Sequence, residues 1–318
     1  MKNFDLFFNK DLISIEDLTN EDIEIILDFA KDIKKNPEKY HNTLHRKIMI
    51  PLFFEPSTRT STSFQAAMTK LGGSVIDFDV LSSSVLKGEN LKDTLKIISG
   101  YYPDFVVIRH KRDGSARFAA DLLDIPVINA GDGQNQHPTQ TLLDLFSINE
   151  IFGKIEGIKI AIAGDLKYGR TAHSLAISLS RYKNCEIFFL SPESLRMPKY
   201  FLNKLKENNC NYLEYNISEI NNIIKKCDLI YMTRIQRERF PEGVEGEQEY
   251  LKVSKEYYLN LDMLKGVKSG FRIMHPLPKV GEIDDKIDNT DFAYYFTQAE
   301  NGLYVRQALL ILIGGINL

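Results

Sequence analysis

The sequence predicts an α/β protein with two doubly wound parallel-sheet domains in series, joined by crossing helices. Short, nearly continuous apolar segments alternate with amphipathic segments of helical period, which is typical of a parallel sheet covered by helices on both faces. The alternation restarts after Gly153, and 318 residues are too many for one ordinary core. We therefore expect a first domain over residues 1–145 and a second over 146–318, whose C-terminal helix returns to the first.

The first domain opens with a predicted helix over residues 18–35. Thr19 is a suitable N-cap, Asp22 stands in the acidic first turn, and apolar residues recur from Ile23 at helical spacing. The segments that follow predict strands at 47–54, 74–80, 104–110 and 125–131, and helices at 61–73, 90–102, 115–124 and 137–153. We expect the last of these helices to cross between the domains.

The second domain follows the same rhythm. Its apolar segments predict strands at 159–165, 186–192, 212–217, 228–234 and 270–278, and its amphipathic segments predict helices at 170–182, 199–209, 219–227 and 304–315. Ligands of parallel sheets bind at the carboxyl ends of strands, often where two domains meet. The polar residues that follow each strand are therefore the candidates for a site.

Composition excludes several classes of function. The net charge is −3, from 40 basic and 43 acidic residues, so no overall bias toward nucleic acid or an anionic membrane is present. Three isolated cysteines, Cys185, Cys210 and Cys227, fit neither a disulfide framework nor a metal site. No apolar run approaches the ~20 residues of a membrane span, and the N-terminus lacks a signal-peptide pattern. We expect a cytoplasmic protein.

The strongest local signal is the segment Ser57-Thr58-Arg59-Thr60, placed where a buried strand turns into a helix. Free backbone N–H groups and the positive end of the helix dipole make such a position an anion site. Arg59 adds a planar fork that matches phosphate oxygens. The alternative is a plain N-cap, but one cap needs one hydroxyl, and no aliphatic residue stands between 57 and 63. The motif is not a P-loop, and Gly164 and Gly169 do not fit a dinucleotide fingerprint.

Arginines recur at the other predicted strand ends. Arg109, Arg170 and Arg234 each follow an apolar run, as Arg59 does. Any one of them is readily explained as surface decoration. Four arginines converging on one crevice would repel one another unless anions neutralised them, so the ligands should carry several negative charges. The polar loop around Ser83 and Lys87 cannot be placed in any site from its residues alone.

Taken together, these segments resemble the catalytic chains of the aspartate carbamoyltransferases, in the aspartate/ornithine carbamoyltransferase superfamily. The resemblance runs from about residue 46 to 312 through FFEPSTRTSTSF, LKGENLKDT, IRH, NQHPTQTLLDLF, GDLKYGRTAHSL, TRIQRERF, MHPLPKVGEI and NGLYVRQALL. It implies transfer of the carbamoyl group of carbamoyl phosphate to L-aspartate, a step of pyrimidine biosynthesis. No metal, cofactor or covalent enzyme intermediate is implied.

The resemblance also implies roles for individual residues. Ser57, Thr58, Arg59 and Thr60 would bind carbamoyl phosphate, and Arg109, His137 and Gln140 would hold its phosphate, carbonyl or amide. Backbone groups at Leu277 and Pro278 would contact the carbamoyl amino group, while Arg170 and Arg234, helped by Thr171 and Gln236, would clamp the aspartate carboxylates. In catalysis, Thr60, Arg109 and His137 would polarise the carbonyl oxygen, and Arg59 and Lys87 would stabilise the departing phosphate.

Ser83 and Lys87 would reach the active site of a neighbouring subunit, which implies a homotrimer with shared sites. The resemblance also allows zinc-containing regulatory chains as separate partners. Two alternatives stay open: an ornithine carbamoyltransferase, and a catalytically silent homologue that acts as a binding subunit. The cationic substrate of the first would be poorly served by Arg170 and Arg234, and its family typically has HCLP where this chain reads HPLP.

Overall fold

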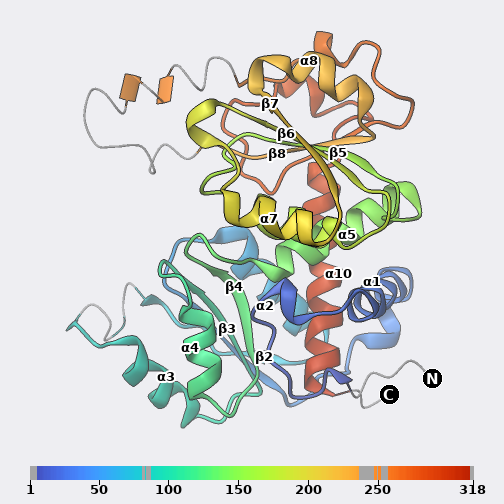
Figure 1. Ribbon diagram of the computed structural model, residues 1–318. Helices are drawn as coiled ribbons and strands as arrows, with labels where there is room; N and C mark the ends of the chain where they lie inside the picture. The colour runs from blue at the N-terminus through green and yellow to red at the C-terminus, as the bar shows by residue number, and fades with distance from the viewer. Residues whose placement is uncertain are drawn as a thin grey trace. The chain divides into compact units, whose positions relative to one another are not determined.

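The computed structural model describes residues 6–80, 83, 87–235, 247–248, 250–251 and 257–315 (Figure 1). The chain forms two compact units, Met1–Phe146 with Glu300–Leu318, and Ser147–Ala299. Each unit contains one parallel sheet with helices, so the predicted fold class is confirmed. Among the described residues, no helix is long and apolar enough to cross a membrane.

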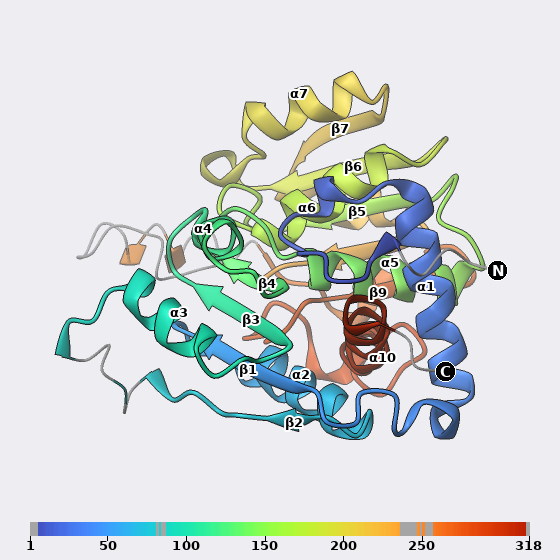
Figure 2. The ribbon, with the colours of Figure 1, turned by 90° about the horizontal axis from the view of Figure 1, so that it is seen from below.

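The first unit is built on a four-stranded sheet of order β2-β1-β3-β4 (Figure 2). Its strands are β1 (Ile48–Phe53), β2 (Ser74–Val75), β3 (Phe105–His110) and β4 (Val127–Asp132), all pairing in parallel. The next strand in the chain, β2, pairs with one side of β1, whereas β3 and then β4 lie on its other side. The point where the strand order reverses therefore lies between β1 and β3, and ligands of open α/β sheets bind at such a point.

Helices cover both faces of this sheet: α3 (Leu91–Ser99) and α4 (Ser115–Leu122) lie on one side, and α2 (Thr58–Lys70) lies on the other (Figure 1). Apolar side chains of β1, β3 and β4 pack with those of α3 and α4 in a core of Ile50, Leu52, Leu95, Ile98, Val106, Ile108, Ala116, Ala119 and Val127. Fully burying one such large apolar side chain is worth roughly 1.5–3 kcal/mol.

The remaining helices of this unit mostly follow the sequence. The helix α1 (Asn20–Lys35) begins after Thr19, which forms a capping box with Asp22, as the sequence predicts. The unit boundary falls within α5 (Pro138–Phe152) and near the start of α10 (Tyr295–Gly314), which begins well before the predicted residue 304. The predicted strand over 74–80 was too long, since β2 ends at Val75. The residues that follow are acidic or partly exposed, and they keep only one further bridge to β1 among the described residues, between Leu52 and Phe78.

The second unit contains a five-stranded parallel sheet of order β7-β6-β5-β8-β9. Its strands are β5 (Lys159–Ala163), β6 (Glu186–Ser191), β7 (Asn211–Asn216), β8 (Leu229–Met232) and β9 (Arg272–Met274). Here the strand order reverses between β5 and β8. The helices α6 (Arg170–Ser180) and α7 (Lys199–Glu207) pack together, and α8 (Ile220–Ile223) covers the opposite face of the sheet (Figure 1).

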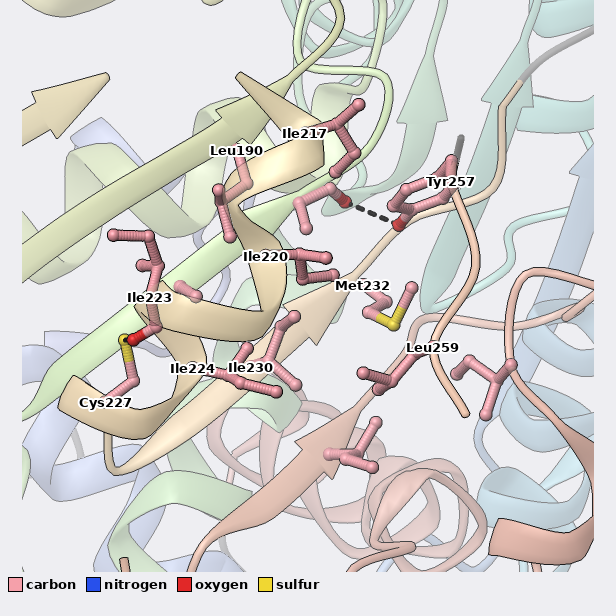
Figure 3. Packing of buried hydrophobic residues seen from close by; sticks show 14 of the residues in the cluster. Leu190, Ile217, Ile220, Ile223, Ile224, Cys227, Ile230, Met232, Tyr257 and Leu259 are labelled. Atoms are coloured by element: carbon pink, nitrogen blue, oxygen red, sulfur yellow. Dashed lines mark hydrogen bonds between the residues drawn. The ribbon is translucent and has the colours of Figure 1, made fainter. Parts of the chain in front are cut away.

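The predicted helix over 219–227 is a composite: one turn of α-helix, α8, stands between 3₁₀ turns at Ile217–Glu219 and Ile224–Lys226. Tertiary packing explains this geometry, since the isoleucines of the segment are all buried against the sheet. Figure 3 shows them beside Ile230 and Met232 of β8.

Candidate active site

The phosphate-binding segment lies at the start of α2, directly after β1. Ser57 occupies the N-cap position, and within the described part of the chain its hydroxyl makes no capping hydrogen bond. The plain N-cap interpretation therefore does not account for it. The next residues, Thr58, Arg59 and Thr60, form the first turn, whose N–H groups have no intrahelical acceptor. The Arg59 side chain is exposed, although partial desolvation lowers the pKa of its guanidinium, and Thr60 is buried.

Arg109 lies beside this segment because β1 and β3 are neighbours. Phe53 and Arg109 are partners in the ladder, and the N–H of Phe54 donates to the carbonyl of Arg109 at 2.8 Å. The guanidinium donates from Nη1 to the Ala130 carbonyl at 3.3 Å, and Nε lies 3.5 Å from Oε2 of Glu55. Glu55 thus orients Arg109 from within the loop that leads to Ser57. The sequence analysis did not single out this carboxylate.

His137 and Gln140 lie at the start of α5, after β4, and both side chains are buried. The loop that carries them is fixed by two buried polar residues that the sequence analysis missed. Asn129 donates to the carboxylate of Asp132 at 2.8 Å and accepts from the N–H of Gly131 at 2.8 Å. Asp132 accepts further from the N–H groups of Gly114 and Gln136, at 2.9 and 3.2 Å, so it joins this loop to the one that follows β3. The pattern Asn-x-x-Asp within the last four residues of an apolar strand was the available signal.

Gln140 has a defined amide orientation. Its Nε2 donates to Oδ1 of Asp144 at 2.9 Å, one helical turn further along α5. A carboxylate can only accept a hydrogen bond, so the Gln140 carbonyl oxygen faces away from Asp144. That oxygen is a suitable acceptor for an amino group of a ligand.

In the second unit, Arg170 and Arg234 flank the reversal point of the sheet. Arg170 is the first residue of α6, in the connection that leaves β5, and Thr171 follows it. Arg234 stands just after the end of β8, the neighbour of β5. All three side chains are partly exposed. The carboxyl ends of two adjacent strands therefore bring two cations to one edge of the sheet.

The glycines of this edge serve packing, which explains why they fit no nucleotide motif. Gly164 has φ +116°, and a Cβ there would stand 2.6 Å from the Thr233 carbonyl oxygen and 2.7 Å from the Tyr257 hydroxyl. A Cβ at Gly169 would stand 2.3 Å from the Asp165 carbonyl oxygen. The buried Tyr257 hydroxyl donates to the Ala163 carbonyl at 2.9 Å and accepts from the Thr233 N–H at 3.1 Å, so it joins the ends of β5 and β8 (Figure 3).

The turn Pro276-Leu277-Pro278 follows β9 and is held by a buried pair, His275 and Glu282. The Leu277 N–H donates to Nδ1 of His275 at 2.7 Å, so Nδ1 must be the unprotonated nitrogen and Nε2 carries the hydrogen. Nε2 then donates to Glu282 at 2.7 Å. Burial raises the pKa of Glu282, but the interactions with His275 and the backbone hydrogen bonds to the carboxylate together outweigh burial, and the pKa is lowered. The pair fixes the backbone of this turn.

The polar loop before α3 is only partly described. The Ser83 hydroxyl donates to the Val80 carbonyl at 2.9 Å, and the Lys87 side chain is exposed. Their assigned roles stay predictions. Gln236 lies outside the described residues. Across the ranges given above, no group of three or more His, Cys, Asp or Glu residues could hold a metal ion.

Known proteins with this architecture have the same two-part organisation. Residues 10–150 match the family described as aspartate/ornithine carbamoyltransferase, carbamoyl-P binding domain, and residues 156–313 match its Asp/Orn binding domain. The chain therefore belongs to the aspartate/ornithine carbamoyltransferase family.

The chain's individual relatives are more specific. The aspartate carbamoyltransferase catalytic subunit of Thermococcus kodakarensis is 50% identical over 310 residues, covering 96% of this chain and 97% of that protein. The catalytic subunit of the M. jannaschii aspartate transcarbamoylase superimposes with a TM-score of 0.86 at 47% identity, covering 95% and 96% of the two chains. The Trypanosoma cruzi aspartate transcarbamoylase in complex with carbamoyl phosphate and aspartate has a TM-score of 0.90 at 34% identity, covering 97% and 98%.

Proposed function

We propose that this chain is an aspartate carbamoyltransferase catalytic subunit, which makes N-carbamoyl-L-aspartate and phosphate from carbamoyl phosphate and L-aspartate. One observation carries the proposal: each sheet places its candidate ligand residues at the loops that flank its own reversal point. In the first unit these loops hold Ser57 to Thr60 and Arg109, which suit a phosphate. In the second they hold Arg170 and Arg234, which suit carboxylates. The first unit binds carbamoyl phosphate, and the second binds aspartate.

The chemistry needs only positioning and charge stabilisation. The aspartate amine attacks the carbamoyl carbon, forming a C–N bond and a tetrahedral intermediate. The C–O bond to phosphate then breaks, and the departing phosphate takes the proton that the amine loses. Thr60, Arg109 and His137 stabilise the negative charge that develops on the carbonyl oxygen. Arg59 and Lys87 stabilise the phosphate as it leaves.

The carbamoyl amino group is held at hydrogen-bond acceptors. The Gln140 side-chain oxygen, turned away from Asp144, is one, and backbone carbonyls at Leu277 and Pro278 supply the others. This arrangement is supported by the buried pair His275 and Glu282, which fixes the turn. The enzyme acts in pyrimidine biosynthesis, in the cytoplasm, without a metal or cofactor in this chain.

Purified protein should carbamoylate aspartate but not ornithine. The reason is that Arg170 and Arg234 attract a dicarboxylate and repel the cationic side chain of ornithine. The measurement is the conversion of each ¹⁴C-labelled amino acid in the presence of carbamoyl phosphate, separated by ion exchange. A preference for ornithine would refute the assignment, and binding of both substrates without turnover would favour the silent homologue.

The catalytic assembly is a homotrimer, in which Ser83 and Lys87 complete the site of the neighbouring subunit. If so, inactive Lys87→Ala chains mixed with inactive Arg59→Ala chains should regain activity, because some sites in a hybrid trimer lack both substitutions. Activity should be measured after denaturation and joint refolding, with mass spectrometry to confirm mixed trimers. Mixed trimers that stay inactive would show that the sites are not shared.

A further inference from the structure

A buried arginine that the mechanism does not use lies on α10. Arg306 is 4% exposed, although arginine is rarely buried without partners. Burial lowers the pKa of its guanidinium to about 10, and the nearby Asp144 carboxylate partly offsets that effect. The side chain is therefore still a cation at neutral pH, and its burial requires an explanation.

The contacts of Arg306 lead to two helices that carry candidate ligand residues. Its Nη1 donates to the Ser63 hydroxyl on α2 at 2.8 Å, and its Cζ lies 5.2 Å from the centre of the Phe64 ring on the same helix. Asp144, its electrostatic partner, lies on α5. All of these residues belong to the first unit.

Both partners stand about one turn beyond the ligand residues of their own helix. Ser63 follows Arg59 and Thr60 on α2, and Asp144 follows Gln140 on α5 and accepts its amide at 2.9 Å. The Ser63 hydrogen bond and the electrostatic attraction to Asp144 thus relate the first turn of α2, through Arg306, to the side chain of Gln140.

We propose that Arg306 is a positioning residue for carbamoyl phosphate, which holds the phosphate-binding end of α2 in register with Gln140 of α5. This inference rests on the proposed function, since it assumes that both helix ends grip one ligand. Displacing a substrate-binding group by about 1 Å can cost on the order of 10²-fold in rate. The guanidinium can act on both helices because it donates a directed hydrogen bond to α2 and its charge attracts the Asp144 carboxylate of α5.

Gly302 makes room for this guanidinium. It stands one turn before Arg306 on α10, and a Cβ at this position would lie 2.2 Å from Nη1 of Arg306 and 3.1 Å from Cδ2 of Leu143. The first of these atoms is the far end of a flexible side chain. An added methyl group would therefore displace the guanidinium from Ser63 without removing its charge.

The test is Gly302→Ala. We expect the KM for carbamoyl phosphate and the Kd for inorganic phosphate, measured by calorimetry, to rise about 10-fold, a fraction of the largest positioning effects. The melting temperature should change little, because the higher helix propensity of Ala offsets the cost of moving the guanidinium. A merely structural role would link weaker binding to lower stability. Ser63→Ala should weaken phosphate binding in the same way, because it removes the hydroxyl that accepts from Arg306. Ser63→Thr keeps a hydroxyl and should bind phosphate as the unsubstituted protein does.

The matched control is Lys34→Met. Lys34 donates to Asn301 of α10 at 2.8 Å and so ties the same helix to α1, which carries no ligand residue. This variant should leave phosphate affinity unchanged. The inference is overturned if Gly302→Ala and Ser63→Ala bind phosphate as the unsubstituted protein does, or if Lys34→Met weakens binding equally. An unsubstituted protein that binds phosphate but transfers no carbamoyl group would count against the proposed function alone, because the phosphate measurement still tests Arg306.

Discussion

Replacing Arg59 by Ala should lower kcat by about 10³-fold while leaving the protein folded, since losing one preorganised donor to a developing charge costs on the order of 10²–10³ in rate. Arg59 lies in the first turn of α2 with an exposed side chain, so its removal leaves no cavity. A planar charge-assisted contact to the departing phosphate is lost, and the backbone N–H groups of the same turn cannot replace it. Steady-state kinetics with both substrates, together with a thermal melt, check this expectation.

Lys70→Ala is the matched control for Arg59→Ala. Lys70 is an exposed cation in the last turn of the same helix, so its loss changes the net charge equally. Its activity should stay within about twofold of the unsubstituted protein, as expected of a surface position. Similar losses of activity in both variants would mean that the net charge of the protein, and not a phosphate-binding site at the start of α2, sets the rate.

Replacing Arg170 by Ala should raise the KM for aspartate by about 10²-fold, because a hydrogen bond between charged groups is worth roughly 1.5–3 kcal/mol. Arg170 is the first residue of α6 in the second unit. The Kd for inorganic phosphate, measured by calorimetry, should therefore stay near that of the unsubstituted protein. Arg170→Lys should give an intermediate KM, since it keeps the charge but loses the planar fork.

Arg196→Ala controls for the loss of a cation in the same unit. Arg196 is exposed and pairs with Glu193 at 2.7 Å, so a neighbouring carboxylate already neutralises its charge. It should leave both kinetic constants unchanged. An Arg170→Ala variant with weakened phosphate binding and an unchanged aspartate KM would reverse the assignment of ligands to units.

Local sequence patterns were sufficient to predict most helices and strands. They failed where the extent of an element depends on the segments packed against it. Thr19 and Asp22 form the capping box that their spacing predicts. The strand over 74–80 was overpredicted because an apolar pattern cannot reveal that β2 is an edge strand with one partner. The segment 219–227 has helical composition, but burial of its isoleucines divides it into short turns.

The amino-acid sequence was enough to predict two parallel-sheet α/β parts and to locate the candidate ligand residues after strands. Both follow from short-range periodicity and from motifs that are continuous in the chain. Only the tertiary structure decided which strand ends are neighbours, because strand order depends on pairing between distant segments: β1 with β3, and β5 with β8. It also revealed partners of the site that are distant in the chain, such as Ser63 and Arg306, which are 243 residues apart. No local pattern encodes such a contact, since it forms only when packing brings the two helices together.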